Sequence, residues 1–201
     1  LNSNSTDAQE DSSINMLGVD ATTLKFGATT AGTKTNEAQA TLTSVGSSVT
    51  TLAFNGDGAA ADTDLDDVVL NLATTTGTQS LAVEYTNTDS DGNLINTTKG
   101  VQLNNAVTAN GVENITITTT QLHADTNATT QDGGVNIALS ADKMSSLTIV
   151  SETLVDLDGG ALDNSVNTVD ASSANGGVLL DMSSAVDADT TTTAAKALTV
   201  T

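Results

Sequence analysis

Short runs of alternating apolar and polar residues, separated by turn-forming residues, are the feature that most narrows what this chain can fold into. In SLAVEYT (80–86), Leu81, Val83 and Tyr85 fall on one side of an extended strand and the intervening residues on the other. Glycine, asparagine and aspartate separate such runs, as in Asn55-Gly56-Asp57-Gly58. The pattern predicts an all-β protein with strands near 22–28, 40–45, 49–55, 67–73, 80–86, 114–119, 135–140, 146–151, 165–172, 177–183 and 197–201. A single helical turn is predicted near 140–144, with Ser140 as its cap.

The spacing of these runs divides the chain into three parts. Residues 1–20 are polar, show no sustained period and are predicted to be a leader or linker. Residues 21–105 are predicted to form an antiparallel or mixed β region. From 106 to 201 the apolar centres recur at intervals of roughly ten or twenty residues, which favours the coils of a right-handed parallel β-helix, or solenoid, truncated at its C-terminal end. A β-sandwich is the alternative, because it contains the same kind of short strand.

The charge of the chain excludes several classes of function. Its 201 residues include 5 lysines, no arginine, and 25 aspartates and glutamates, for a formal net charge of −20. Nucleic acids and anionic membranes both attract clustered Lys and Arg, so neither partner is expected.

The absence of cysteine excludes disulfides and thiolate metal sites, and no apolar stretch of about 18 residues could span a bilayer. The chain lacks an initiator Met and a signal peptide and ends within an expected strand, so we expect a longer parent polypeptide.

Several segments resemble a known protein family. Residues 111–118, with the sequence Gly-Val-Glu-Asn-Ile-Thr-Ile-Thr, are similar to the GVENITIT element of bacterial surface-layer proteins of the secreted, calcium-dependent RTX type. Residues 146–150 and 166–172 resemble β-coils that follow in those proteins, and 197–201 resembles the strand that leads into their glycine- and aspartate-rich nonapeptides. The resemblance implies a lattice-forming region of a secreted surface protein. The calcium-binding G-G-x-G-x-D nonapeptide is absent, and its nearest approaches are Asp132-Gly133-Gly134 and Asp158-Gly159-Gly160.

One segment has the opening of a calcium-binding loop. In residues 87–94, oxygen-bearing side chains at alternate positions are followed by glycine. A hard cation needs several oxygens that converge on a tight turn, so the predicted ligands are Asn87, Asp89, Asp91 and Asn93. Thr98 stands where such a loop has a bidentate acid. The alternative is a hairpin between 80–86 and 94–103, with Asp91-Gly92 as its turn.

Two further groups of carboxylates are candidates for calcium. Five aspartates lie within eleven positions, at Asp57, Asp62, Asp64, Asp66 and Asp67. Like charges this close repel unless cations or solvent offset them. The alternation at 62, 64 and 66 would place three carboxylates on one side of an extended segment, with a solvated loop as the alternative. Asp156 and Asp158, before Gly159-Gly160, form a third and weaker candidate.

Nothing in the sequence indicates catalysis. His123 is the only imidazole and has neither a recognisable nucleophile nor zinc ligands to accompany it. We therefore expect a structural protein of the extracellular bacterial cell surface that assembles with itself into a lattice or fibre stabilised by Ca2+. Contacts to cell-surface polysaccharide would come from regions outside this chain. The alternative is a ligand-binding module of a large secreted adhesin.

Overall fold

Alternating apolar and polar residues form strands throughout the part of the chain that the structure describes. The computed structural model describes residues 12–27, 39–56, 63–65, 67–73, 76–88, 102–120, 122, 134–157, 166–180 and 199–201. Among these residues there are strands and turns but no helix. The strands are β1 (Ser12–Asn15), β2 (Thr23–Gly27), β3 (Gln39–Val45), β4 (Thr51–Asn55), β5 (Thr63–Asp64), β6 (Asp67–Leu72), β7 (Ser80–Thr86), β8 (Gln102–Asn110), β9 (Asn114–Thr119), β10 (Gly134–Ser140), β11 (Ser146–Ser151), β12 (Leu154–Leu157), β13 (Thr168–Ala174), β14 (Val178–Leu180) and β15 (Thr199–Val200).

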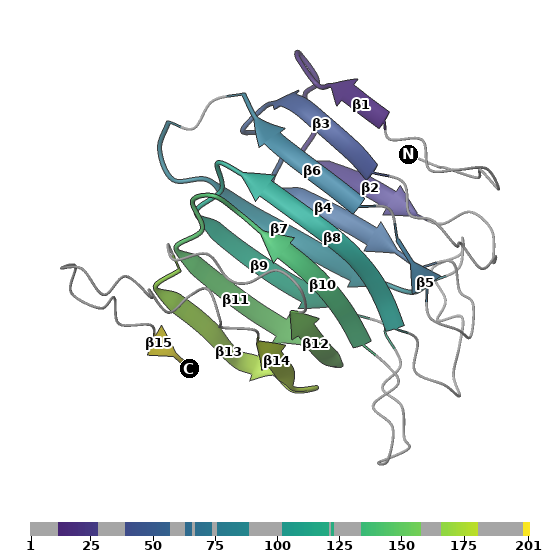
Figure 1. Cartoon of the computed structure of the whole chain (residues 1–201), viewed down its shortest axis with the longest axis vertical. Helices are drawn as coiled ribbons and strands as arrows, with labels where there is room; N and C mark the ends of the chain where they lie inside the picture. The colour runs from purple at the N-terminus through teal and green to yellow at the C-terminus, as the bar shows by residue number, and fades with distance from the viewer. Residues whose placement is uncertain are drawn as a thin grey trace, which may run out of the picture.

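Two parallel sheets contain all of these strands. Sheet A has the order β1-β3-β6-β8-β10-β12-β14, with β5 also paired to β8, and sheet B has the order β15-β13-β11-β9-β7-β4-β2. The chain passes from sheet A to sheet B and back, and each coil lies beside the previous one, from the N-terminal coils at the top of Figure 1 to the C-terminal coils at the bottom. Registered residues on neighbouring coils are 28 positions apart at Leu24 and Leu52, and 32 apart at Ile115 and Leu147. The structure therefore confirms the predicted all-β parallel solenoid.

The antiparallel pairing predicted for residues 21–105 is wrong. β2, β4 and β7 pair in parallel within sheet B, and β3 pairs in parallel with β1 and β6 within sheet A. Both sheets continue past residue 105, because β7 pairs with β9 and β6 with β8. The solenoid also includes β1, which falls within the predicted leader. Alternation determines which side chains face inward but carries no information on strand direction.

The hairpin considered between 80–86 and 94–103 does not form, because β7 pairs in parallel with β4 on one side and with β9 on the other and has no edge left for an antiparallel partner. Residues 94–101 of its second strand lie outside the described residues, and the next described strand, β8, belongs to sheet A. The connection from β7 to β8 therefore crosses from one sheet to the other.

Inward-facing side chains stack in columns, because the strands are parallel and in register. One column of sheet B contains Leu52, Val83, Ile117 and Ile149, which are all fully buried. Burying one such side chain contributes about 1.5–3 kcal/mol. These aliphatic columns between the two sheets are therefore the main source of stability.

All three aromatic residues of the chain lie in one column. Phe26, Phe54 and Tyr85 are in register on β2, β4 and β7. Neighbouring rings are stacked, with centroids 5.1 Å and 5.2 Å apart. The next positions in the column are Thr119 on β9 and Ser151 on β11. The column thus changes from aromatic rings to hydroxyls midway along the solenoid.

Local backbone conformations shape the ends of the sheet A strands. Gly111 follows β8 with a φ of 87°, which glycine adopts without strain, and its N–H donates to Asp142 Oδ1 at 2.6 Å. Ser44 has a φ of 56° within β3, where the register with β6 shifts as at a β-bulge.

The helical turn predicted near 140–144 is wrong, because a non-helical turn follows β10 and ends at the buried Met144.

Candidate cation-binding edge

Four neighbouring strands of sheet B end at one edge of the solenoid. β2, β4, β7 and β9 are parallel, so their carboxyl ends lie side by side, and the chain continues from each of them to sheet A. We call this the carboxyl edge of sheet B. The aspartate cluster at 57–67 follows β4, and the predicted calcium loop at 87–94 follows β7. Two candidate sites that are separate in sequence therefore begin on neighbouring strands.

A set of hydrogen bonds, which we call the Asn55 clamp, joins the ends of β4 and β7. Asn55 Oδ1 accepts the Thr88 N–H at 2.9 Å and the Thr86 hydroxyl at 3.0 Å, and Asn55 Nδ2 donates to the Thr88 carbonyl at 2.8 Å. The Gly56 N–H donates to the Thr86 carbonyl at 2.8 Å. An asparagine side chain that bonds both backbone groups of one residue extends the sheet by one step. The clamp fixes the starts of the two connections to each other.

Asn87, the first predicted loop ligand, is a buried residue that is only 4% exposed. Its side chain approaches Gly56 so closely that a Cβ there would lie 2.5 Å from Asn87 Oδ1 and 2.9 Å from Leu103 Cδ2. A side chain at position 56 would therefore have to displace Asn87 or Leu103, so the limit at this position is space and not φ. The other predicted ligands of this loop, Asp89, Asp91 and Asn93, lie outside the described residues.

Asp67 of the aspartate cluster accepts a hydrogen bond from the backbone of the neighbouring strand β8. Its Oδ1 accepts the Ala106 N–H at 2.7 Å, beside the break between β5 and β6. The carboxylate thereby replaces a strand-to-strand hydrogen bond and satisfies a backbone donor. Asp64 lies in β5 and its backbone pairs with Asn104. The remaining members, Asp57, Asp62 and Asp66, lie outside the described residues.

Asp64 and Asp156, which belong to two different predicted sites, share one register column of sheet A. The column runs from Asp64 through Asn104 and Asn136 to Asp156. Three interstrand steps of about 4.8 Å separate the two aspartates, which is too far for one ion to bind both. Asp158, the other member of the third predicted site, lies outside the described residues.

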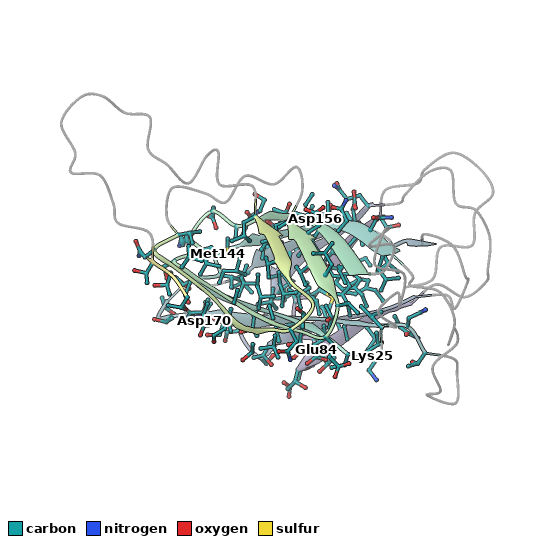
Figure 2. All side chains as sticks on the ribbon, turned by 90° about the horizontal axis from the view of Figure 1, so that it is seen from below. Lys25, Glu84, Met144, Asp156 and Asp170 are labelled. Carbon is teal, nitrogen blue, oxygen red and sulfur yellow. The ribbon has the colours of Figure 1, made fainter. Side chains whose placement is uncertain are left out.

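In the registers of the described strands, no charged residue is paired with a residue of like charge. Glu84 lies between Ala53 and Thr118, and Asp170 lies beside Thr148. Figure 2 shows Lys25, Glu84 and Asp170 on the outer face of sheet B. Asp156 lies on the other side of the molecule, on sheet A. Like charges on directly paired residues would repel at strand spacing.

Only nine of the 25 acidic residues fall within the described residues, so sixteen belong to the rest of the chain.

Asp170 and Tyr85, both among the described residues, have displaced pKa values. The Ser172 hydroxyl donates to Asp170 Oδ1 at 2.6 Å and the Ser172 N–H at 3.0 Å, and these bonds lower the pKa of Asp170. Burial raises the pKa of Tyr85 far above its ordinary value, and its hydroxyl donates to Asn105 Oδ1 at 2.8 Å. Tyr85 therefore stays neutral at pH values at which an exposed tyrosine would already be ionised.

Sequence reasoning missed the residues of the Asn55 clamp. Asn55 falls in a glycine-rich turn, and its pairing with Thr86 and Thr88 depends on the register of β4 with β7. A usable signal exists, because the alternating runs 49–55 and 80–86 both end at these positions. Aligning the two runs as neighbouring coils would have brought Asn55 beside Thr86.

Within the described ranges, no group of three or more acidic or histidine side chains is placed to hold a metal ion. His123 lies outside these ranges. No helix in the same part of the chain is long and apolar enough to cross a membrane. No protein family, characterised protein or solved structure matches this chain.

Proposed function

We propose that this chain is a structural element of an extracellular bacterial surface layer and assembles with copies of itself into a calcium-stabilised lattice. The parallel solenoid supports this role, because each coil contacts only its neighbours and stacked coils make an extended rod. The resemblance of residues 111–118 to surface-layer proteins supports it from the sequence.

The outer faces of the sheets suit lateral contacts between rods. In sheet A, Asn110 Nδ2 donates to Asn71 Oδ1 at 2.8 Å on the neighbouring strand. In sheet B, Asn114 Nδ2 donates to Ser80 Oγ at 3.3 Å. Faces rich in amides and hydroxyls and poor in charge reduce the repulsion that a net charge of −20 would otherwise impose on contacts between copies.

Calcium would act at the carboxyl edge of sheet B. A calcium ion takes six to eight oxygen ligands, and the Asn55 clamp holds the start of the aspartate cluster beside the start of the loop at 87–94. Ligands drawn from both connections would join two coils and offset the repulsion between their carboxylates. The clamp is the observation on which this proposal depends most.

Thermal unfolding with calcium or with a chelator tests the proposal. A site that binds only the folded state adds about 2.7 kcal/mol at a calcium concentration 100 times its Kd. For a chain of this length, that gain raises the melting temperature by about 5–11 °C per site. Replacement of both loop carboxylates, Asp89→Asn with Asp91→Asn, should remove most of the shift.

The control is Glu84→Gln, which removes one carboxylate from the outer face of sheet B, on the strand that precedes the loop. It should keep the full calcium shift, whereas equal losses in both variants would indicate general screening instead of a site. An unchanged melting temperature in the unmodified chain would contradict the calcium role. A calcium-stabilised chain that stays monomeric and retains a ligand would instead favour the adhesin module.

A further inference from the structure

Exposed apolar side chains gather at the two ends of the solenoid. The described part of the chain has five large hydrophobic side chains that are exposed, and four of them lie on the first or the last coil. Leu17 and Val19 follow β1 in the first coil, and Leu179 and Val200 lie on β14 and β15 in the last coil. Only Val150, on β11, lies between the ends. Exposed apolar groups that are confined to particular places indicate interaction sites.

Both ends also leave inward-facing positions of the core uncovered. Val200 is in register with Val169, yet its side chain is 56% exposed, whereas that of Val169 is fully buried. At the other end, Leu24 is only partly buried, although Leu52, its neighbour in register, is fully buried. These residues occupy positions that one more coil would cover. Solenoids whose ends face solvent have polar capping repeats instead.

The strands at the ends have open hydrogen-bonding edges. Among the described strands, β1 pairs only with β3 and β2 only with β4, while β14 pairs only with β12 and β15 only with β13. All strands of a sheet run in the same direction, so the free edge of the last strand offers the donors and acceptors that the free edge of the first strand needs. Stacking the top of one molecule in Figure 1 on the bottom of another would therefore continue both sheets with the parallel pairing that they already have.

The end strands lack the charges that would oppose such a contact. The chain has 25 acidic residues, but none of them lies on β1, β2, β14 or β15, and the one charged side chain on these strands is Lys25. Charged residues, proline and bulges are the usual means by which proteins protect an exposed strand edge. The chain contains no proline, and the end strands pair with their neighbours without a register shift. Two copies can therefore meet at these strands without bringing strand carboxylates together.

We propose that copies of this chain associate head to tail, with β14 and β15 of one copy against β1 and β2 of the next. Such a contact is heterologous, so each added copy leaves a free end and the association extends along the rod. This contact rests on the proposed self-assembly, of which it is the axial step, but it does not involve the carboxyl edge of sheet B. β14 and β15 contain only three and two residues, so the contact is small and weak. Without calcium, the copies should therefore separate at the dilution used for microscopy.

Sedimentation velocity of the full chain in a chelator, over a wide range of protein concentration, tests the contact. We expect a sedimentation coefficient that rises with concentration. Val200→Asp should weaken the association by about tenfold or more, because the contact would bury an unpaired carboxylate. The matched control is Val150→Asp, which adds the same charge at an exposed valine on the outer face of sheet B and should associate like the unmodified chain. Equal losses in the two variants, or a chain that stays monomeric at every concentration, would overturn the proposal.

A mixture of two variants tests the head-to-tail geometry. Leu17→Asp adds a charge to the first coil and Val200→Asp adds one to the last, so each variant keeps one unmodified end. Each variant alone should stay monomeric at concentrations at which the unmodified chain associates, whereas an equal mixture should form dimers. Dimers of either variant alone, or a mixture that stays monomeric, would contradict the head-to-tail contact.

The end contact and the calcium lattice can fail separately. Ordered sheets in calcium, together with a monomer at every concentration in the chelator, would support the lattice and overturn the end contact. Concentration-dependent association in the chelator, without sheets in calcium, would support the end contact and contradict the lattice.

Discussion

Replacing Phe54 by leucine should destabilise the protein by about 0.5–1.5 kcal/mol more than the same change at Phe26. Phe54 stacks on both Phe26 and Tyr85, whereas Phe26 stacks only on Phe54 among the described residues. Each stacked pair is worth about 0.5–1.5 kcal/mol beyond its buried area. Phe54→Leu thus loses about 1–3 kcal/mol of ring stacking and Phe26→Leu about half of that. The two rings are similarly buried, at 1% and 5% exposed, so the loss of apolar burial is nearly matched.

Urea unfolding followed by circular dichroism measures this difference, provided that the dependence on urea concentration stays constant. The double variant closes a thermodynamic cycle and should return a coupling energy of about 0.5–1.5 kcal/mol for the Phe26–Phe54 pair. A coupling below about 0.3 kcal/mol, or equal losses in the two single variants, would refute the ring column as a source of stability.

Three further predictions follow from single residues. Because burial raises the pKa of Tyr85, the tyrosine of the unfolded chain loses its proton at a lower pH than that of the folded protein. The contribution of Tyr85 to the free energy of unfolding is therefore fully present below about pH 10 and falls by about 1.4 kcal/mol per pH unit above it. Tyrosinate absorbance should appear together with unfolding, and a titration within the folded state would contradict burial. The lowered pKa of Asp170 means that its stabilisation is present above the ordinary carboxyl pKa of about 3.9 and is lost as the pH falls through the lower folded value. Asp170→Asn should therefore flatten the acid limb of the stability curve, and an unchanged limb would show that the Ser172 bonds contribute nothing. Gly176→Ala should destabilise by about 1–3 kcal/mol or more, since its Cβ would overlap the Thr153 backbone, whereas Gly27→Ala, with open space around it, should be tolerated in the same thermal unfolding experiment.

The alternation of residues was sufficient to predict most strands and which of their faces is buried. The run 114–119 coincides with β9, and 80–86 coincides with β7, because apolar residues at every second position have one way to face a core. β8 was not predicted, since its inward positions include the polar Asn105 beside Leu103 and Val107. A buried amide breaks the apolar pattern that sequence reasoning uses.

Pairing direction and register could not be predicted from the same pattern. Asp91-Gly92 suits a hairpin turn, yet β7 and β8 belong to different sheets. The stacking of Phe26, Phe54 and Tyr85, which lie 28 and 31 positions apart, is visible in hindsight as the register of successive coils. The Asn55 clamp depends on that same register, which is why the carboxyl edge of sheet B could not be assembled from individual motifs.

Electron microscopy of the chain with calcium and with a chelator, at equal ionic strength, tests the central claim of a calcium-stabilised lattice most directly. We predict ordered sheets or fibres in calcium and dispersed particles in the chelator. Dispersed particles under both conditions, or the same assemblies in both, would contradict it.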